Sequence, residues 1–502
     1  MDVVELEPAI LKVAQECGPV NHDALANRKL HVFIGDARER LLTTREKYDL
    51  IASEPSNPYR AGIAGLFTRE FYESVQERLE PGGLFLQWVQ AYEIDDATIQ
   101  TIYRTLGSVF PNIESWQPQD GDLVLVASRE PVHYDLEGLR ARLAEEPFKT
   151  ALPAVWRANG LEDFLAHYIA NASVAKALAL GSGPLNTDDR TVIEFAFARS
   201  VDLAQGFQIA TLRAGAQAAQ ADRPQFAQAE PDWFRLEEAR LAMNATYKEL
   251  AQIEPLLTSP QRSRAAALAS YNAGDFPTAL RLWRAQSEEP KTLPEFALLA
   301  DTLAAEGDSA ALPYLEKLAE VLPSDAEAIR AQLLSRQGRI EEAVRRLDNF
   351  FRDIRHNPWP ARELINRAIL SAAPIAYADP SKLAATFLYE SLRFPLCVYT
   401  NEENRLLQMV NLGVFLDGKN PGQYTLAAIE AVEPNVPWQA DFLMIRKACY
   451  SATQNPKAER ASRDLDEFLK LQTSFIDAVG LTTKIEKRDA KKNPEPDATA
   501  RP

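Results

Sequence analysis

The stretch YDLIASEPSNPYRAG, residues 48–62, runs from an apolar strand into a polar loop. Its first six residues have the composition of a short buried strand. Glu54 and Asn57 then stand at the strand end, where Pro55 and Pro58 fix the backbone angle φ on both sides of the acid. Such a loop is either a ligand-binding strand end or a braced turn, and the surrounding sequence decides between them.

Strands and helices alternate on both sides of this loop. The apolar pattern predicts strands at 2–6, 29–35, 48–53 and 84–90, and helices at 8–17, 36–44, 66–79 and 95–110. Two further strands, at 112–117 and 122–128, flank a PQDG turn and predict an antiparallel hairpin. Parallel βα units closed by a hairpin indicate a doubly wound α/β sheet, whose ligands bind at the carboxyl ends of the strands.

Polar side chains collect at those strand ends. They are Glu5 and Glu7 on the first strand, Asp36 on the second, Glu54 and Asn57 on the third, and Gln87 on the fourth. A carboxylate in this place can bind ribose hydroxyls, as the acid of dinucleotide-binding sheets does. Asp36 alone is equally a helix N-cap, but four polar ends on one edge favour a binding site.

Composition limits the class of protein. The 502 residues are enough for two or more domains, and 46% hydrophobic with 25% charged residues is ordinary for a globular chain. The net charge of −16 disfavours nucleic acid and suits a cationic small molecule. The three cysteines and five histidines have no metal-ligand spacing, so no metal is predicted. No stretch approaches a membrane span, and the chain is predicted to be cytoplasmic.

Several motifs in roughly the first 200 residues resemble one enzyme family. They are VVELEP (3–8), GDARERLL (35–42), YDLIASEPSNP (48–58), LFTREFY (66–72), LEPGGLFLQW (79–88) and LNTDDRTVIEF (185–195). In order and spacing they are similar to the polyamine aminopropyltransferases, the spermidine and spermine synthases, and most of all to bacterial versions fused to extra domains. The resemblance implies a methyltransferase-like Rossmann fold. It also implies transfer of an aminopropyl group from decarboxylated S-adenosylmethionine to a small cationic amine.

The resemblance assigns a role to each strand-end residue. It implies that Glu54, in the position of the family's catalytic aspartate, is the base. It also implies that Glu5, Asp36 and Ala37 bind the nucleoside. The amine would be bound by Asn57 and Gln87. A base is needed because an alkylammonium has a pKa of about 10 and must lose its proton before nitrogen attacks the carbon beside the sulfonium. Glu54 is one methylene longer than aspartate, and Asn57 brings no negative charge, which predicts weaker diamine binding.

Family members have one more strand and a glycine-rich turn before the VVELEP motif, whereas this sequence starts at Met1 on the second strand. The absent strand would lie between the strands at 2–6 and 48–52. We therefore expect a gap there, with no hydrogen-bonded ladder joining the two. The chain is interpreted as an amino-terminally incomplete version of a longer protein, with impaired activity. Fused relatives often carry upstream membrane helices, which would place such a parent at the inner face of the membrane.

The rest of the chain is predicted to be helical. The expected domains are an incomplete Rossmann-like domain at 1–130, a helical extension closing with LNTDDR at 131–203, an α-helical region at 204–480 and a disordered tail at 481–502. ALASYNAGDFPTALRLW (267–283) has the spacing of a tetratricopeptide helix pair, and the period is close to about 34 residues. Such stacks bind proteins or peptides on a concave surface, unless the helices only pack on the first domain. The acids at 186–190 either line the cleft or cap a turn.

Three functions fit these patterns. The first is an aminopropyltransferase, the second is a methyltransferase that uses intact S-adenosylmethionine on the same fold, and the third is a non-catalytic scaffold that binds a protein partner through its helical repeats. The relative affinity for decarboxylated and intact S-adenosylmethionine separates the first two. Failure to bind either nucleoside favours the third.

Overall fold

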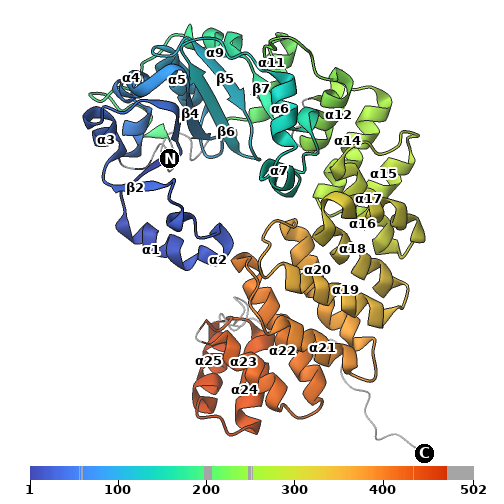
Figure 1. Ribbon diagram of the computed structural model, residues 1–502. Coiled ribbons are helices and arrows are strands. Elements are labelled where there is room, and N and C mark those ends of the chain that lie inside the picture. Colours follow the sequence, from blue (N-terminus) through green and yellow to red (C-terminus); the bar gives the residue numbers. More distant parts are fainter. Residues whose placement is uncertain are drawn as a thin grey trace, which may run out of the picture. The chain divides into compact units, whose positions relative to one another are not determined.

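Figure 1 shows a computed structural model of the chain, which describes residues 1–55, 57, 60, 62–196, 206–246, 250, 251, 253–433 and 435–471. It divides into two compact units, residues 1–337 with 356–361, and residues 338–355 with 362 onward. The strands and all the strand-end residues named above belong to the first unit. No helix among the described residues is long and apolar enough to cross a membrane.

A parallel ribbon of two strands begins the first unit. β1 (Asp2–Glu5) pairs with β2 (His31–Ile34), so that Glu5 lies opposite Ile34. The connection holds α1 (Pro8–Glu16), α2 (Gly18–Asn21) and the 3₁₀ turn η1 (Ala24–Ala26), and α3 (Ala37–Thr43) follows β2. Proline at the first position of α1 and the Glu7 cap before it explain why the helix starts there. This βαβα order was predicted from the apolar pattern.

The larger sheet has five strands in the order β3-β4-β6-β5-β7. They are β3 (Tyr48–Ser53), β4 (Leu79–Gln90), β5 (Asn112–Trp116), β6 (Asp122–Ser128) and β7 (Tyr168–Ala170). β3 and β4 are parallel and the other neighbours antiparallel, which confirms the predicted hairpin of β5 and β6. β7 contradicts the expectation of helices alone between 135 and 180, because three buried residues are too short a run to give a periodic signal.

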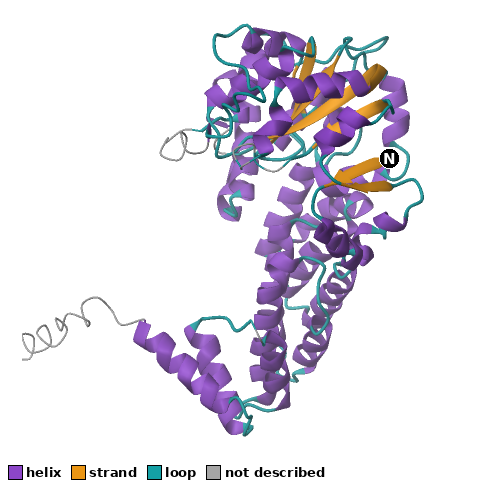
Figure 2. Cartoon of the chain, turned by 90° about the vertical axis from the view of Figure 1, so that its left-hand side faces the viewer, coloured by secondary structure: helices purple, strands orange, loops and turns teal. Residues whose placement is uncertain are grey.

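No strand ladder joins β1 to β3 in the described part of the chain, as the predicted gap requires. Figure 2 shows the two-stranded ribbon apart from the larger sheet. Side chains connect the starts of the two strands: the Tyr48 hydroxyl donates to Asp2 Oδ2 at 3.0 Å, and Arg40 Nη2 lies 3.9 Å from the same oxygen. The two strands therefore begin beside each other without sharing backbone hydrogen bonds.

The hydrophobic core of the first unit packs against the larger sheet. α4 (Arg69–Arg78), after the 3₁₀ turn η2 (Ile63–Phe67), and α5 (Asp96–Gly107) contribute many of its side chains. Phe85 of β4 stacks on Phe110 with ring centroids 5.9 Å apart. Among residues 1–43, no side chain that the structure describes is buried, and Ile34 remains 50% exposed. The two-stranded layer thus has no buried core of its own.

The Pro81-Gly82-Gly83 motif lies inside β4, which begins at Leu79, directly after α4 ends at Arg78. The predicted strand began only after this motif, at residue 84. Tyr48 pairs with Leu79 and Leu50 with Leu84, so the residues between Leu79 and Leu84 bulge out of the ladder. A side chain on Gly83 would come within 3.0 Å of the Glu80 and Tyr48 carbonyl oxygens. The bulge therefore requires glycine at this position.

Helices make up most of the remaining first unit. They are α6 (Leu136–Leu143), α7 (Phe148–Trp156), α8 (Leu161–Leu165), α9 (Ala172–Ala179), α11 (Ile209–Ala218), α12 (Trp233–Met243), η3 (Glu254–Leu256), α14 (Ser259–Asn272), α15 (Phe276–Arg284), α16 (Leu293–Glu306), η4 (Ser309–Ala311), α17 (Leu312–Val321) and α18 (Pro323–Arg336). The helix pair predicted at 267–283 is formed by α14 and α15, with Gly274 at φ +80° in the turn between them.

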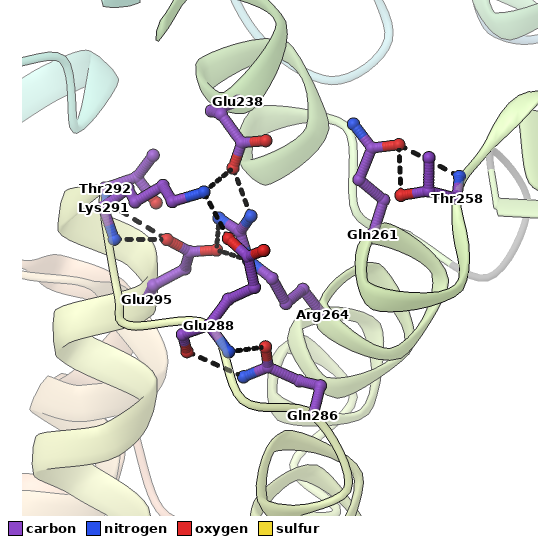
Figure 3. A network of polar contacts seen from close by, with 9 residues as sticks. All are labelled: Glu238, Thr258, Gln261, Arg264, Gln286, Glu288, Lys291, Thr292 and Glu295. Carbon is purple, nitrogen blue, oxygen red and sulfur yellow. Dashed lines mark hydrogen bonds and ion pairs between the residues drawn. The ribbon is translucent and has the colours of Figure 1, made fainter. Parts of the chain in front are cut away.

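A buried ion cluster joins three of these helices (Figure 3). The Arg264 guanidinium of α14 contacts the carboxylates of Glu238 from α12 and Glu295 from α16. Lys291 Nζ lies 3.5 Å from Glu238 Oε2 and 2.6 Å from Glu288 Oε2. Since Arg264 is only 1% exposed, its charge depends on these carboxylates for compensation.

The second unit is helical throughout its described residues. Its elements are α19 (Ile340–Asp353), α20 (Arg362–Tyr377), α21 (Leu383–Leu392), η5 (Tyr399–Asn401), α22 (Glu402–Asp417), α23 (Gln423–Val432), α24 (Ala440–Ala452) and α25 (Ala458–Leu471). The tail predicted at 481–502 lies outside the described residues.

Candidate functional site

Glu5 and Glu7 lie where β1 passes into α1. Glu5 Oε1 accepts a hydrogen bond from the Glu7 backbone N–H at 2.8 Å, and Glu7 Oε1 accepts one from Ala9 at 2.9 Å, which caps the helix. The Gly35 N–H donates to the Glu5 carbonyl at 3.0 Å. Glu5 is thereby held beside the turn that leads to Asp36, at the carboxyl edge of the two-stranded ribbon.

Asp36 is the N-cap of α3. Its Oδ1 accepts a hydrogen bond from the Arg38 backbone N–H at 2.7 Å, and Ala37 is the first helical residue. The structure therefore confirms the interpretation of Asp36 as a helix N-cap. Capping uses one carboxylate oxygen, and the nucleoside-binding role expected for Asp36 stays a prediction.

Arg38 connects this edge to the larger sheet. Its Nη1 donates to the Gly65 carbonyl at 3.0 Å, and its Nη2 forms an ion pair with Asp188 Oδ2 at 2.5 Å. Gly65 lies in η2, just beyond the loop that follows β3. Partial burial raises the pKa of Asp188, but the hydrogen bond and charge of Arg38 outweigh it and hold that pKa below its ordinary value. Sequence patterns gave no signal for Arg38, because its partner is distant in the chain.

The segment 185–195 packs against η2, α4 and α5. Asn186 is fully buried, and its side chain donates to the Ala64 carbonyl at 3.0 Å. Its backbone N–H donates to Thr105 Oγ1, also at 3.0 Å. Of the acids at 186–190, Asp188 ties the segment to α3 through its ion pair with Arg38, and a role of these acids in lining a cleft stays a prediction.

The loop after β3 carries the proposed catalytic residue. Glu54 directly follows β3 and is exposed, whereas Asn57 is half-buried and its carbonyl accepts from the Arg60 N–H at 3.0 Å. Pro58, the second predicted brace, lies outside the described residues. The exposure of Glu54 leaves its carboxylate accessible to a substrate that enters at the strand end.

Gln87 lies beside the root of that loop. It pairs with Ser53 in the ladder between β3 and β4 and has no exposed surface. Its amide nitrogen donates to the Trp88 carbonyl at 3.0 Å and to the Ser53 carbonyl at 3.5 Å. Its amide oxygen is buried, and no donor from the described residues reaches it. A buried acceptor in this state is costly unless a ligand supplies the hydrogen bond.

The predicted residues thus fall into two groups. Glu5, Asp36 and Ala37 lie at the carboxyl end of the two-stranded ribbon. In the larger sheet, Gln87 pairs with Ser53, and Glu54 is the residue that follows Ser53. Arg38 links the α3 end of the first group to the segment just beyond the loop of the second. Carboxylates, an amide and a helix N-terminus thus stand at the ends of parallel strands in a Rossmann-like α/β fold, where ligands of such folds bind.

Comparison with known proteins narrows this class. Residues 1–117 match the spermine/spermidine synthase domain family. The polyamine aminopropyltransferase of Lachnospira eligens is 26% identical over 159 residues, which is 31% of this chain and 53% of that protein. The polyamine aminopropyltransferase of Korarchaeum cryptofilum is 28% identical over 109 residues, 22% of this chain and 34% of that protein. Residues 1–117 are therefore similar to the spermine/spermidine synthase domain, as their motifs indicated.

Other relatives give the same picture with shorter coverage. The thermospermine synthase of Arabidopsis thaliana is 31% identical over 101 residues, 19% of this chain and 30% of that protein. The solved structure of a probable spermidine synthase from Corynebacterium glutamicum is 17% identical to this chain. Its TM-score is 0.26, and the match covers 37% of this chain and 63% of that one. The chain spans about half, or less, of the length of the curated relatives it matches.

Proposed function

We propose that the strand-end site transfers an aminopropyl group from decarboxylated S-adenosylmethionine to a polyamine. The observation that carries this proposal is the buried amide oxygen of Gln87 beside the root of the Glu54 loop. An ammonium or amine N–H of a substrate would donate to that oxygen, and the substrate nitrogen would then lie near an exposed carboxylate. Neither a simple cap nor a braced turn explains why this acceptor is left without a donor.

Each residue has a defined task in this reaction. Glu54 accepts a proton from the attacking ammonium, since the amine lone pair must be available. The amine nitrogen then forms a bond to the propyl carbon, the carbon–sulfur bond breaks, and sulfur keeps the electron pair and leaves as the neutral thioether nucleoside. Glu5 binds the ribose hydroxyls, and Asp36 with Ala37 holds the adenine. Asn57 accepts a hydrogen bond from the amine without adding charge, so diamines bind weakly.

We also infer that the transfer is slow in this chain. β1 and β3 each have an edge with no strand neighbour in the described residues, and the layer of residues 1–43 has no buried core. A further strand between β1 and β3 would satisfy both edges and fix the distance between the nucleoside and amine groups. Without it, the two halves of the site are held together mainly by side-chain contacts such as that of Tyr48 with Asp2.

A second candidate is a peptide-binding role for the helices after residue 204. It is favoured by Gly274 and Gly307, which stand in the left-handed region at φ +80° and +76° in alternate interhelical turns, after α14 and after α16. Their separation is close to one tetratricopeptide repeat of about 34 residues. This role is compatible with the enzyme proposal, and it stands alone only if the strand-end site binds no nucleoside.

Titration calorimetry with three nucleosides tests these proposals. We expect decarboxylated S-adenosylmethionine and 5′-methylthioadenosine to bind more tightly than intact S-adenosylmethionine, whose additional carboxylate would approach the acids of this site. Tighter binding of the intact nucleoside, with methyl transfer to an acceptor, would replace the proposal by the methyltransferase alternative. If none of the three binds, the scaffold alternative is correct.

A further inference from the structure

A second cavity lies in the first unit, lined by none of the strand-end residues. It has a volume of about 530 Å³ and lies between α11, α12 and the start of α14. This volume is within the range of small-molecule sites. The charged lining residues are three arginines and two acids: Arg213, Arg223, Arg240, Asp222 and Glu237. In a chain of net charge −16, a cavity wall with more cations than anions is unusual.

Arg240 is the best-defined side chain of this wall. It is 4% exposed, and its Nη1 contacts Asp222 Oδ2 at 2.7 Å and Glu237 Oε1 at 2.9 Å. Its Nη2 donates to the Asp222 carbonyl at 2.6 Å. Its Nε–H is buried, and no acceptor from the described residues reaches it. An acceptor oxygen supplied by a ligand would satisfy this donor.

The other two arginines each contact a neighbour, Arg213 as a buried side chain and Arg223 as an exposed one. Arg213 is 4% exposed and donates through Nη2 to the amide oxygen of Gln117, at the end of β5. The Arg223 guanidinium lies over the Trp233 ring, 4.0 Å from its centroid. Immobilised guanidinium groups lose little entropy when they bind an oxyanion, and their planar donors match carboxylate and phosphate oxygens.

Amide side chains complete the lining. Gln217, Gln220, Asn244 and Gln261 supply donors and acceptors around the arginines. We propose that this cavity binds a small organic molecule through a carboxylate or phosphate group, with the oxyanion on the arginines and uncharged polar groups on the amides. This site is distinct from the strand-end site and does not depend on its activity.

Calorimetry at constant ionic strength tests the proposal with inorganic phosphate and citrate, and with chloride as the control for non-specific screening. We expect saturable binding of one equivalent of phosphate, of citrate or of both. Phosphate alone would identify the ligand group as a phosphate, and citrate alone as a carboxylate. Saturable binding of neither anion would overturn the proposal.

A matched pair of variants places the binding in this cavity. Gln217 is a half-buried lining residue of α11, so Gln217→Glu adds a negative charge to the wall without changing its shape. We expect about a tenfold loss of anion affinity from that like-charge repulsion. Gln332 is a half-buried glutamine of α18 that does not line the cavity, and Gln332→Glu should leave affinity unchanged. Equal affinities in both variants, each shown to be folded by its melting temperature, would contradict the assignment.

Discussion

Arg38 and Asp188, 150 positions apart in the sequence, form an ion pair with 2.5 Å between Nη2 and Oδ2. The pair holds the N-terminus of α3, with Asp36 and Ala37, against the segment at 185–195. Because β1 and β3 share no ladder in the described residues, side-chain contacts of this kind help to hold Glu5 and Asp36 in place relative to Glu54 and Gln87.

Asp188→Asn should therefore weaken nucleoside binding. The change removes the charge that orients Arg38 but keeps the shape of the side chain. We expect the affinity for 5′-methylthioadenosine to fall about threefold to tenfold, while the stability changes by about 1 kcal/mol or less, because the pair is partly exposed. Asp189→Asn, at the exposed neighbouring position, is the control. Equal nucleoside affinities in the two variants would show that the pair has no role in the site.

Gln87→Leu should impair amine binding selectively. Leucine fills the same buried position but removes the acceptor that we assign to the substrate. We expect the KM for the amine to rise about tenfold, the cost of one lost hydrogen bond to a charged group. Nucleoside affinity should stay within about twofold. Gln90→Leu, a fully buried glutamine on the same strand, is the control for general damage to β4. The same amine KM in both variants would remove Gln87 from the site.

Glu114 should make stability depend on pH. Its carboxyl group accepts hydrogen bonds from the Tyr134 hydroxyl at 2.5 Å and the Tyr168 hydroxyl at 3.3 Å, and burial raises its pKa from an ordinary 4.5 to about 7. Because the pKa of Glu114 is raised in the folded state, protonated Glu114 contributes to the free energy of unfolding. This contribution is fully present below pH 4.5 and is lost as pH rises through about 7.

Glu114→Gln tests this dependence, because glutamine does not ionise. Urea unfolding of both proteins from pH 4.5 to 8 gives the difference in unfolding free energy. We expect wild type to lose about 3 kcal/mol relative to the variant across this range. The contribution of His167, whose pKa burial lowers to about 4, cancels in the comparison because both proteins contain it. A constant difference would mean that Glu114 does not titrate there.

Arg264→Met should destabilise the helical part of the first unit. The substitution leaves the buried carboxylates of Glu238 and Glu295 without their main compensating charge. We expect the unfolding free energy to fall by about 3–5 kcal/mol, the usual cost of breaking a buried ion pair from one side. Arg262→Met, at an exposed position of the same helix, should change it by less than about 0.5 kcal/mol. Similar denaturant midpoints for the two variants would contradict the assigned role of the cluster.

The extent of sequence-based prediction differed between parts of the chain. The strands at 2–6 and 29–35 and the helices after them were predictable because apolar periodicity and caps such as Asp36 are local signals. The gap between β1 and β3 was expected from the family resemblance, because family members have one more strand before the VVELEP motif. β7 was not predictable, since three residues give no period, and Arg38 was not, since its partner lies across the fold. Burial of Gln87 with an unsatisfied oxygen is a tertiary property that no local pattern encodes.

The central claim concerns Glu54, and steady-state transfer from decarboxylated S-adenosylmethionine to a diamine tests it most directly. Wild type, Glu54→Gln and Asn57→Asp should be assayed together with 5′-methylthioadenosine binding. We predict that Glu54→Gln lowers kcat by about 10²–10⁴ through loss of the general base, with nucleoside affinity unchanged. Asn57→Asp should instead lower the KM for the diamine, because it places a charge opposite an ammonium group. Equal turnover of wild type and Glu54→Gln, or no transfer by the wild type, would contradict the account.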